Sequence, residues 1–275
     1  MSEECTHDCN SCGQNCGSRS PESLVATPYK GTKIGKIIGV VSGKGGVGKS
    51  MVTDLLAVSL AKKGYKVGIM DGDITGPSIP KYFGLTEKAT ADSEGHINPV
   101  TTSNGIKVIS MNLMLPKDDD AVIWRGPVIA GVVKQFYQDV NWGDLDYLFV
   151  DMPPGTGDVP LTVFQSIPIK GIVVAMSPSG LVEIIVKKAL HMAKMMGKKV
   201  IGLVENMSYL ECPDCGKHIE VFGTSTVDKI AEEENIDTVC KLPINPEISK
   251  LTETGKISEV ETNYLENITE KIENL

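Results

Sequence analysis

Short, continuous runs of apolar residues recur along most of the chain. A run that stays apolar at successive positions is typical of a strand buried on both faces of a parallel sheet. Such runs occupy residues 36–42, 66–71, 106–111, 147–151, 171–176, 199–205 and 237–242. Helix-like stretches, such as 52–64 and 181–199, lie between several of them. This alternation predicts an α/β fold with a doubly wound, mostly parallel sheet, in a single domain over residues 31–275.

The two ends of the chain depart from this pattern. Residues 1–30 are rich in Cys, Ser, Gly, Asn and Pro and have almost no apolar periodicity. We therefore expect a flexible N-terminal tail that is ordered only where it holds something. Residues 258–275 predict an acidic, amphipathic surface helix.

Charge and hydropathy exclude some classes of protein. The 275 residues carry a formal net charge of −8, which argues against a general nucleic-acid binder because that function needs a basic surface. No apolar run approaches the roughly 18–20 residues of a membrane span. The N-terminus lacks the basic and then apolar regions of a signal peptide. We therefore expect a cytoplasmic protein with no nucleic-acid or membrane partner.

Residues 43–50, GKGGVGKS, match the P-loop pattern G-x-x-x-x-G-K-S/T between a predicted strand and a predicted helix. Lys49 would reach the β- and γ-phosphates of a nucleotide and Ser50 would bind Mg²⁺. An ordinary glycine-rich turn is the alternative, which the strand–loop–helix context disfavours. The expected nucleotide-binding residues are Gly43, Lys44, Gly45, Gly46, Val47, Gly48, Lys49 and Ser50.

Carboxylates end two of the predicted strands. Asp151 stands where P-loop enzymes place the group that holds Mg²⁺, directly or through water, although a strand-end aspartate also caps turns. Asp71 and Asp73 end another strand, and one of them would orient the attacking water; the sequence does not separate them. Lys44, a second lysine within the loop, is either a solvated side chain or a second positive charge aimed at the transferring phosphate.

Several motifs together resemble a known family. KGGVGKS, with its extra Lys44, resembles the deviant P-loop ATPases that include MinD, ParA and the nitrogenase iron protein. Within that group the chain is similar to the Mrp/ApbC branch of iron–sulfur cluster carrier proteins, from about Lys36 to Ile248. The motifs that carry this similarity are DGDITGPSIP, VIWRGP, LDYLFVDMPPGTGD, GLVENMS, CPDCG and LPINPEI.

The resemblance implies a P-loop NTPase fold and roles for individual residues. It implies that Lys44 reaches the phosphates of the partner in a nucleotide-sandwich homodimer. It assigns Asp73 to switch I and Asp151 to switch II, and it places Asn206 against adenine with Pro243 beside the base. The chain departs from the family at position 51, where Met51 replaces a common second hydroxyl residue.

The cysteines fall into two groups. Cys212 and Cys215 supply two ligands where a structural metal usually takes four. His218 would be a third ligand within the chain, whereas a twofold dimer would supply two plus two. The resemblance implies a 4Fe–4S cluster bridging the two subunits, with zinc as the alternative. Cys240 lies in an apolar run and is expected to be a buried small hydrophobe.

Four cysteines also lie in the tail. Cys5, Cys9, Cys12 and Cys16 form a complete ligand set for a second iron–sulfur cluster, and His7 leaves zinc open. Disulfides are disfavoured in a reducing compartment. This segment resembles the four-cysteine extension of cytosolic iron–sulfur scaffold relatives in kind only. Residues 18–35 would form a leash spanning at most about 60 Å. We therefore hypothesise cluster transfer or electron exchange between the two cysteine sites.

The leading hypothesis is an ATPase that uses ATP and Mg²⁺ to carry a 4Fe–4S cluster at a homodimer interface and to transfer it to apo-proteins. One alternative is a MinD/ParA-like positioning ATPase with a zinc site, but residues 249–275 hold three Lys and six Glu rather than a basic membrane-binding end. The other is an electron-transfer protein like the nitrogenase iron protein. The cluster cysteines of that protein lie mid-chain, where residues 17–211 contain none.

Overall fold

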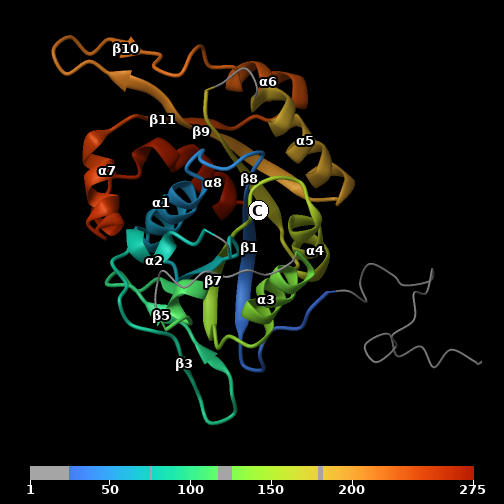
Figure 1. The fold of residues 1–275 in the computed structure, drawn as a ribbon. Helices are drawn as coiled ribbons and strands as arrows, with labels where there is room; N and C mark the ends of the chain where they lie inside the picture. Colours follow the sequence, from blue (N-terminus) through green and yellow to red (C-terminus); the bar gives the residue numbers. More distant parts are fainter. Residues whose placement is uncertain (1–24, 75, 117–125, 179–181) are drawn as a thin grey trace, which may run out of the picture.

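A nine-stranded, mostly parallel sheet forms the centre of the molecule (Figure 1). The computed structural model describes residues 25–74, 76–116, 126–178 and 182–275. The strands lie in the order β10 (His218–Ile219), β9 (Lys199–Glu211), β8 (Gly171–Met176), β1 (Lys33–Ser42), β7 (Asp144–Asp151), β2 (Val67–Asp71), β6 (Lys107–Ile109) and β5 (Val100–Thr101), with β11 (Val239–Pro243) also paired to β9. Only the β5–β6 and β9–β10 pairs of this sheet are antiparallel.

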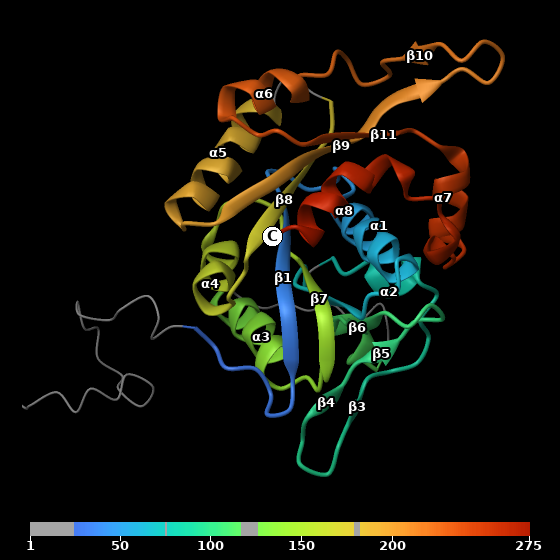
Figure 2. The ribbon, with the colours of Figure 1, turned by 180° about the vertical axis from the view of Figure 1, so that it is seen from behind.

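Helices cover both faces of the sheet, as Figures 1 and 2 show from opposite sides. One face packs against α1 (Lys49–Lys62), α2 (Ile79–Tyr82), α7 (Pro246–Glu253) and α8 (Glu266–Glu273). The other packs against α3 (Gly126–Gln138), α4 (Asp158–Ser166), α5 (Val182–Met195) and α6 (Val227–Glu234). Within β7, Leu148 and Val150 face the second group while Tyr147 and Phe149 face the first, as a pleated strand requires. The predicted doubly wound fold is confirmed.

Two predicted elements differ in extent. The apolar run 106–111 forms a strand only over β6, and a 3₁₀ turn, η2 (Met111–Leu113), follows directly after Ser110, whose hydroxyl donates to Asp71 at 2.9 Å. The predicted helix over 258–275 is wrong in its extent. Two 3₁₀ turns, η3 (Ile257–Glu259) and η4 (Asn263–Leu265), precede α8, whose residues Ile268 and Ile272 are fully buried. A small hairpin, β3 (Thr90–Ala91) with β4 (Ile97–Asn98), was not predicted.

The chain packs against the domain before β1 begins. Ala26 is buried, and its N–H donates to the carbonyl of Ser166 at the end of α4, at 2.7 Å. The hypothesised leash over residues 18–35 is therefore wrong at its C-terminal end, where Ala26 is anchored to the domain, and its residues 18–24 lie outside the described residues. The four tail cysteines, Cys5, Cys9, Cys12 and Cys16, lie outside the described residues.

Strand β9 continues past its neighbour β8 and forms a projecting hairpin with β10 (Figure 1). We call residues 209–222 the arm. Just before it, the β9–β11 register shifts between Lys241 and Pro243, and Met207 has a left-handed backbone with φ of 56°. This irregularity separates the part of β9 inside the sheet from the arm. None of the described helices combines the length and apolar character that crossing a membrane would require.

Candidate functional site

The glycine-rich loop joins the carboxyl end of β1 to the amino end of α1. Gly48 has φ of 80°, a left-handed conformation that glycine adopts without strain. A Cβ at this position would also collide with the amide nitrogen of Asn206. The sequence therefore needs glycine here both for the turn and for the close approach of β9. The loop leaves the first amides of α1 at a helix N-terminus, where they can bind an anion.

The buried carboxylate of Asp151 organises the loop's polar side chains. It accepts hydrogen bonds from Lys49 Nζ at 2.7 Å, Ser50 Oγ at 2.6 Å and Thr53 Oγ1 at 2.7 Å. Burial alone would lower the pKa of Lys49, but the negative charges around it, Asp151 foremost, outweigh burial and leave that pKa raised. The lysine is therefore held as a cation. Thr53 is a member of this site that the P-loop pattern did not indicate.

The structure separates Asp71 from Asp73. Asp71 is fully buried, accepts from Ser110, and has a pKa raised to about 8 by burial and by the nearby charge of Asp151. The Asp73 carboxylate is 18% exposed and lies 3.7 Å from Lys49 Nζ. Asp73 is thus the more accessible of the two carboxylates and lies beside Lys49, whereas Asp71 is closed off from solvent.

Asp54, in the second turn of α1, is a buried carboxyl that sequence reasoning missed. Its side chain is fully buried, and neither oxygen has a hydrogen-bond partner among the described residues. Burial, followed by the charges of Asp151 and Asp71, raises its pKa well above the usual range. Burial without a hydrogen-bond partner thus favours the neutral form of the Asp54 carboxyl. A helical aspartate followed by apolar residues carries no sequence signal that distinguishes it from a solvated one.

The donor set fits Mg²⁺. Ser50 Oγ and the Asp151 carboxylate lie within 2.6 Å of each other, and hard oxygen ligands of this kind are those that Mg²⁺ prefers. The Lys44 side chain is partly exposed at the rim of the loop. Across the part of the chain that the structure describes, its ammonium makes no ion pair, so it is available to an anion.

Asn206 joins β9 to the loop. Its amide nitrogen donates to the carbonyl of Val47 at 3.0 Å, while its buried amide oxygen has no partner within the described residues. The free oxygen can accept a hydrogen bond from an amino group, such as the one that adenine carries. Pro243 ends β11 and pairs in register with Tyr209 of β9. The structure thus places Asn206 at the loop and Pro243 on the next strand.

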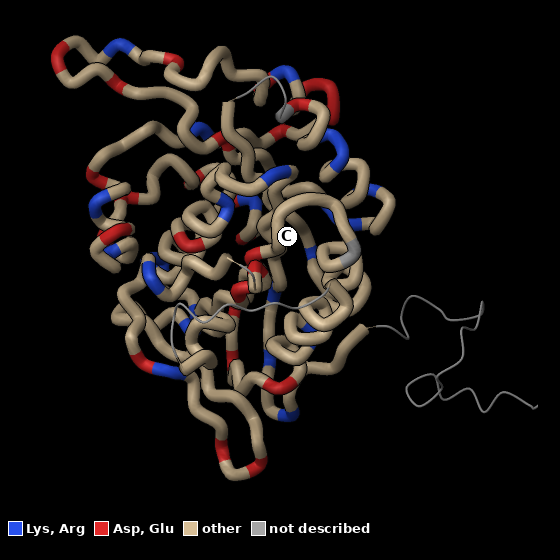
Figure 3. Tube along the Cα trace, viewed as in Figure 1, with Lys and Arg blue, Asp and Glu red and all other residues tan. Residues whose placement is uncertain are grey.

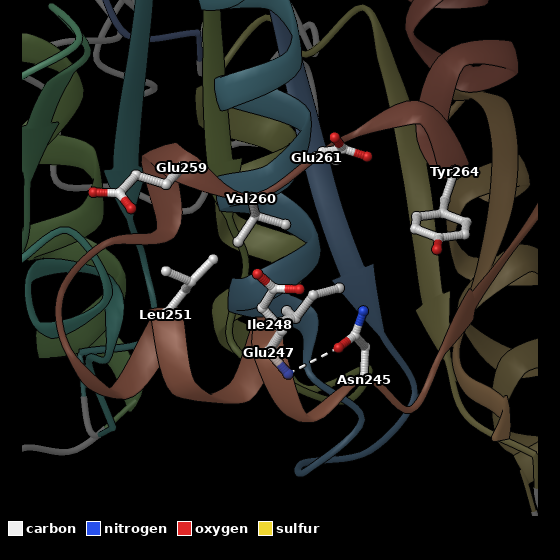
Figure 4. A pocket seen from close by; sticks show the side chains of 8 residues that line it. All are labelled: Asn245, Glu247, Ile248, Leu251, Glu259, Val260, Glu261 and Tyr264. Carbon is white, nitrogen blue, oxygen red and sulfur yellow. Dashed lines mark hydrogen bonds between the residues drawn. The ribbon is translucent and has the colours of Figure 1, made fainter. Parts of the chain in front are cut away.

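A separate hollow of about 320 Å³ lies between α7 and residues 259–264 (Figure 4). Figure 4 shows Asn245 at its rim, where the side chain accepts from the N–H of Glu247 at 2.8 Å and caps α7. Its lining includes the carboxylates of Glu247, Glu259 and Glu261. Three like charges would repel a triphosphate, so the hollow does not compete with the loop for nucleotide.

Cys212 and Cys215 lie in the turn of the arm, half-exposed and exposed respectively. The turn is closed by the Cys212 N–H donating to the Lys217 carbonyl at 3.0 Å and by the Gly216 N–H donating to the Cys212 carbonyl at 2.9 Å. The backbone N–H groups of Asp214 and Cys215 donate to the Cys212 sulfur and lower the pKa of its thiol. A thiolate is the form that binds iron or zinc, so the pair fits a metal cargo.

His218 does not complete a metal site with the cysteines. No group of three or more His, Cys, Asp or Glu side chains within the described ranges is placed to hold a metal ion. The His218 ring instead stacks on Tyr209, with ring centroids 3.9 Å apart. In this structure His218 thus packs on Tyr209 rather than beside the two cysteines. Cys240 is buried in the core, as predicted.

Comparison with known proteins shows which family the chain belongs to. A family profile described as the NUBPL iron-transfer P-loop NTPase, of the ParA group, matches residues 33–275. The chain belongs to this iron-transfer P-loop NTPase family. An "Iron-sulfur cluster carrier protein" from Clostridium perfringens is 50% identical over 251 residues, which cover 89% of this chain and 87% of the relative. One of the same name from Methanocaldococcus jannaschii is 39% identical over 284 residues, covering 98% of each chain.

Solved structures agree with this family. A nucleotide-binding protein from Archaeoglobus fulgidus, solved in complex with ADP, matches with a TM-score of 0.76 and 44% identity over 85% of this chain and 91% of that one. The cell division ATPase MinD from Pyrococcus furiosus matches with a TM-score of 0.61 and 21% identity, over 87% of this chain and 99% of that one. The MinD likeness shows the shared fold alone. The resemblance to the carrier branch is confirmed as family membership.

Proposed function

We propose that this member of the family is an ATP-dependent carrier that holds a 4Fe–4S cluster on Cys212 and Cys215 of two subunits and transfers it to apo-proteins. The observation that carries the proposal is the course of β9. The same strand contacts the glycine-rich loop through Asn206 and ends at Glu211, directly before Cys212. A change at the nucleotide therefore has a short, covalent route to the cysteine pair.

Hydrolysis of ATP is assigned to the residues around Asp151. Lys49 and Lys44 would bind the phosphates, and bound Mg²⁺, held by Ser50 and Asp151, would supply a Lewis acid for the phosphate oxygens. Asp73, the accessible carboxylate, would orient the water that attacks the terminal phosphorus. The buried hydrogen bonds of Asp151 support this assignment, because they preorganise the lysine and the serine before nucleotide binds.

The bridging position of the cluster follows from ligand number. Four thiolates suit an iron–sulfur cluster, and each arm supplies two. A twofold dimer supplies the remaining pair from an identical arm. The backbone hydrogen bonds that lower the pKa of the Cys212 thiol favour the thiolate, which is the form that binds iron.

Delivery from the loaded protein to an apo-protein client tests this function. Anaerobically loaded wild type should release its cluster to the client when ATP and Mg²⁺ are present. Lys49→Ala should abolish ATP hydrolysis and delivery while leaving iron and sulfide uptake partly intact, because the cysteines lie outside the loop. Lys63→Ala, which removes a surface lysine just after the same helix, is the matched control. Unchanged delivery by Lys49→Ala would refute the coupling.

A further inference from the structure

Exposed apolar side chains gather on the arm. Ile219, Val221 and Phe222 are 45%, 49% and 54% exposed, within four successive positions. The other large exposed apolar residues in the described part of the chain are scattered along the sequence. Scattered exposed apolar residues are normal, whereas a cluster of them on a projecting element marks an interaction surface.

We call the exposed side chains of Ile219, Val221 and Phe222 the apolar edge of the arm. His218 stacks on Tyr209, and the next residue, Ile219, points to the opposite face of the hairpin because side chains alternate along a strand. The hydrogen bonds that close the cysteine turn fix the same hairpin. The apolar edge and the cysteine pair therefore lie on one continuous segment, residues 209–222.

We propose that Ile219, Val221 and Phe222 form a contact between the arms of two copies of this chain, which brings their two cysteine pairs together at a twofold axis. This inference rests on the proposed function. A second copy is favoured because each arm carries half of a four-thiolate set, and an identical arm supplies the other half in the same geometry. In a symmetric contact, the apolar edge of one arm meets that of the other without burying an unpaired charge.

The charges of the arm are also compatible with contact to the arm of a second copy. Glu211, Asp214, Lys217 and Glu220 place both signs along the hairpin, as Figure 3 shows for this region. In an antiparallel pairing of two arms, Lys217 of each copy can face a carboxylate of the other. Such mixed charges at the rim fix orientation without preventing contact.

The size of the edge predicts how the contact behaves. A large apolar side chain that is half exposed offers roughly 100 Å², so three of them bury about 300 Å² per copy. Stable interfaces bury about 800 Å² per partner. The arm contact is therefore too small to hold two empty chains together. It acts with the shared cluster, slowing cluster loss by keeping both cysteine pairs in place.

The test compares a Val221→Ser/Phe222→Ser double variant with Met195→Ser, which changes an exposed apolar residue at the end of α5. The full chains are loaded anaerobically with iron and sulfide. The arm-bound pool is the difference between the iron bound by wild type and the iron bound by a Cys212→Ser/Cys215→Ser chain. We expect the double variant to lose this pool to a chelator at least tenfold faster than wild type and Met195→Ser, and to sediment mostly as monomer after loading, with ATP affinity unchanged.

A second measurement does not depend on the serine variants. Benzoylphenylalanine placed at position 222 should cross-link two loaded chains under light, whereas the same probe at position 195 should not. Wild-type cluster retention by the double variant together with no cross-link at 222 would overturn the arm contact. Normal retention with slowed delivery to a client would also overturn it, because the edge would then bind the client.

Failure of the proposed function gives a different result. Wild type would then bind no arm-dependent iron, or would hold its full iron complement as a monomer. Either outcome is read from the unmodified chain alone. It is therefore distinguishable from failure of the arm contact, in which wild type behaves as expected and only the apolar edge proves dispensable.

Discussion

Replacing Asp71 with asparagine should stabilise the nucleotide-free protein, and more so at higher pH. Asp71 is fully buried, and its pKa is raised from 3.8 to about 8, first by burial and then by the charge of Asp151. The folded chain therefore keeps a proton on Asp71 that the unfolded chain loses above pH 3.8. Where the native state binds more protons, the free energy of unfolding falls as pH rises. For Asp71 this decline extends from pH 3.8 to about 8.

The size of the effect follows from the two pKa values. At about 1.4 kcal/mol per pH unit, the accumulated cost in wild type is about 1.6 kcal/mol at pH 5 and about 4 kcal/mol at pH 7. Asparagine avoids this cost but accepts only one of the two hydrogen bonds that Asp71 receives from Ser110 Oγ and the Asp73 N–H. That loss costs about 1 kcal/mol. The net gain is therefore about 3 kcal/mol at pH 7 and close to zero at pH 5.

Urea unfolding with a magnesium chelator present, at pH 5, 6, 7 and 8, measures this difference. Asp237→Asn, whose side chain is 87% exposed, is the control and should follow wild type at every pH. If the stability of Asp71→Asn runs parallel to that of wild type across this range, the carboxyl does not titrate within it and the reasoning is refuted.

Three further changes test other parts of the molecule. Asn206→Ala should weaken ATP binding about five- to tenfold by calorimetry, because one hydrogen bond contributes about 1 kcal/mol; equal affinity would remove Asn206 from the site. Trp142→Ala should lower the urea-unfolding free energy by about 3–5 kcal/mol, because Trp142 is fully buried and its indole N–H donates to Phe136. Cys212→Ser should lose arm-bound iron but keep ATP affinity, as shown by iron analysis beside calorimetry, and retained iron would contradict the cysteine assignment.

Much of the fold could be predicted from local patterns. Residues 171–176 and 147–150 are apolar at every position and form strands, as expected for burial on both faces of a parallel sheet. The helix after residue 48 was indicated by the P-loop pattern, which depends on short-range geometry. The C-terminal end was predicted less well. Its pattern is helical, but two 3₁₀ turns, η3 and η4, precede α8 and pack against α1, and the apolar pattern alone does not separate them from a helix.

In the candidate site, too, the residues that belong to a local motif were predicted and those that depend on tertiary packing were not. Lys49, Ser50 and Asp151 were predicted and are brought together, because the motif encodes the loop and the parallel strands bring the carboxylate to it. The separation of Asp71 from Asp73 was not available from the sequence. It depends on tertiary packing, which buries Asp71 completely and leaves Asp73 partly exposed beside Lys49. Asp54 was missed for the same reason, since its burial results from tertiary packing of α1 rather than from any motif.

The course of β9 also limits how this chain can change in length. Side chains alternate along a strand, so inserting or deleting one residue between Tyr209 and Cys212 would turn the cysteines to the opposite face of the arm. The same change in the turn between β3 and β4 would alter only a surface hairpin. Surface turns of this chain can therefore gain or lose residues, whereas the number of residues between Asn206 and Cys212 has to stay constant.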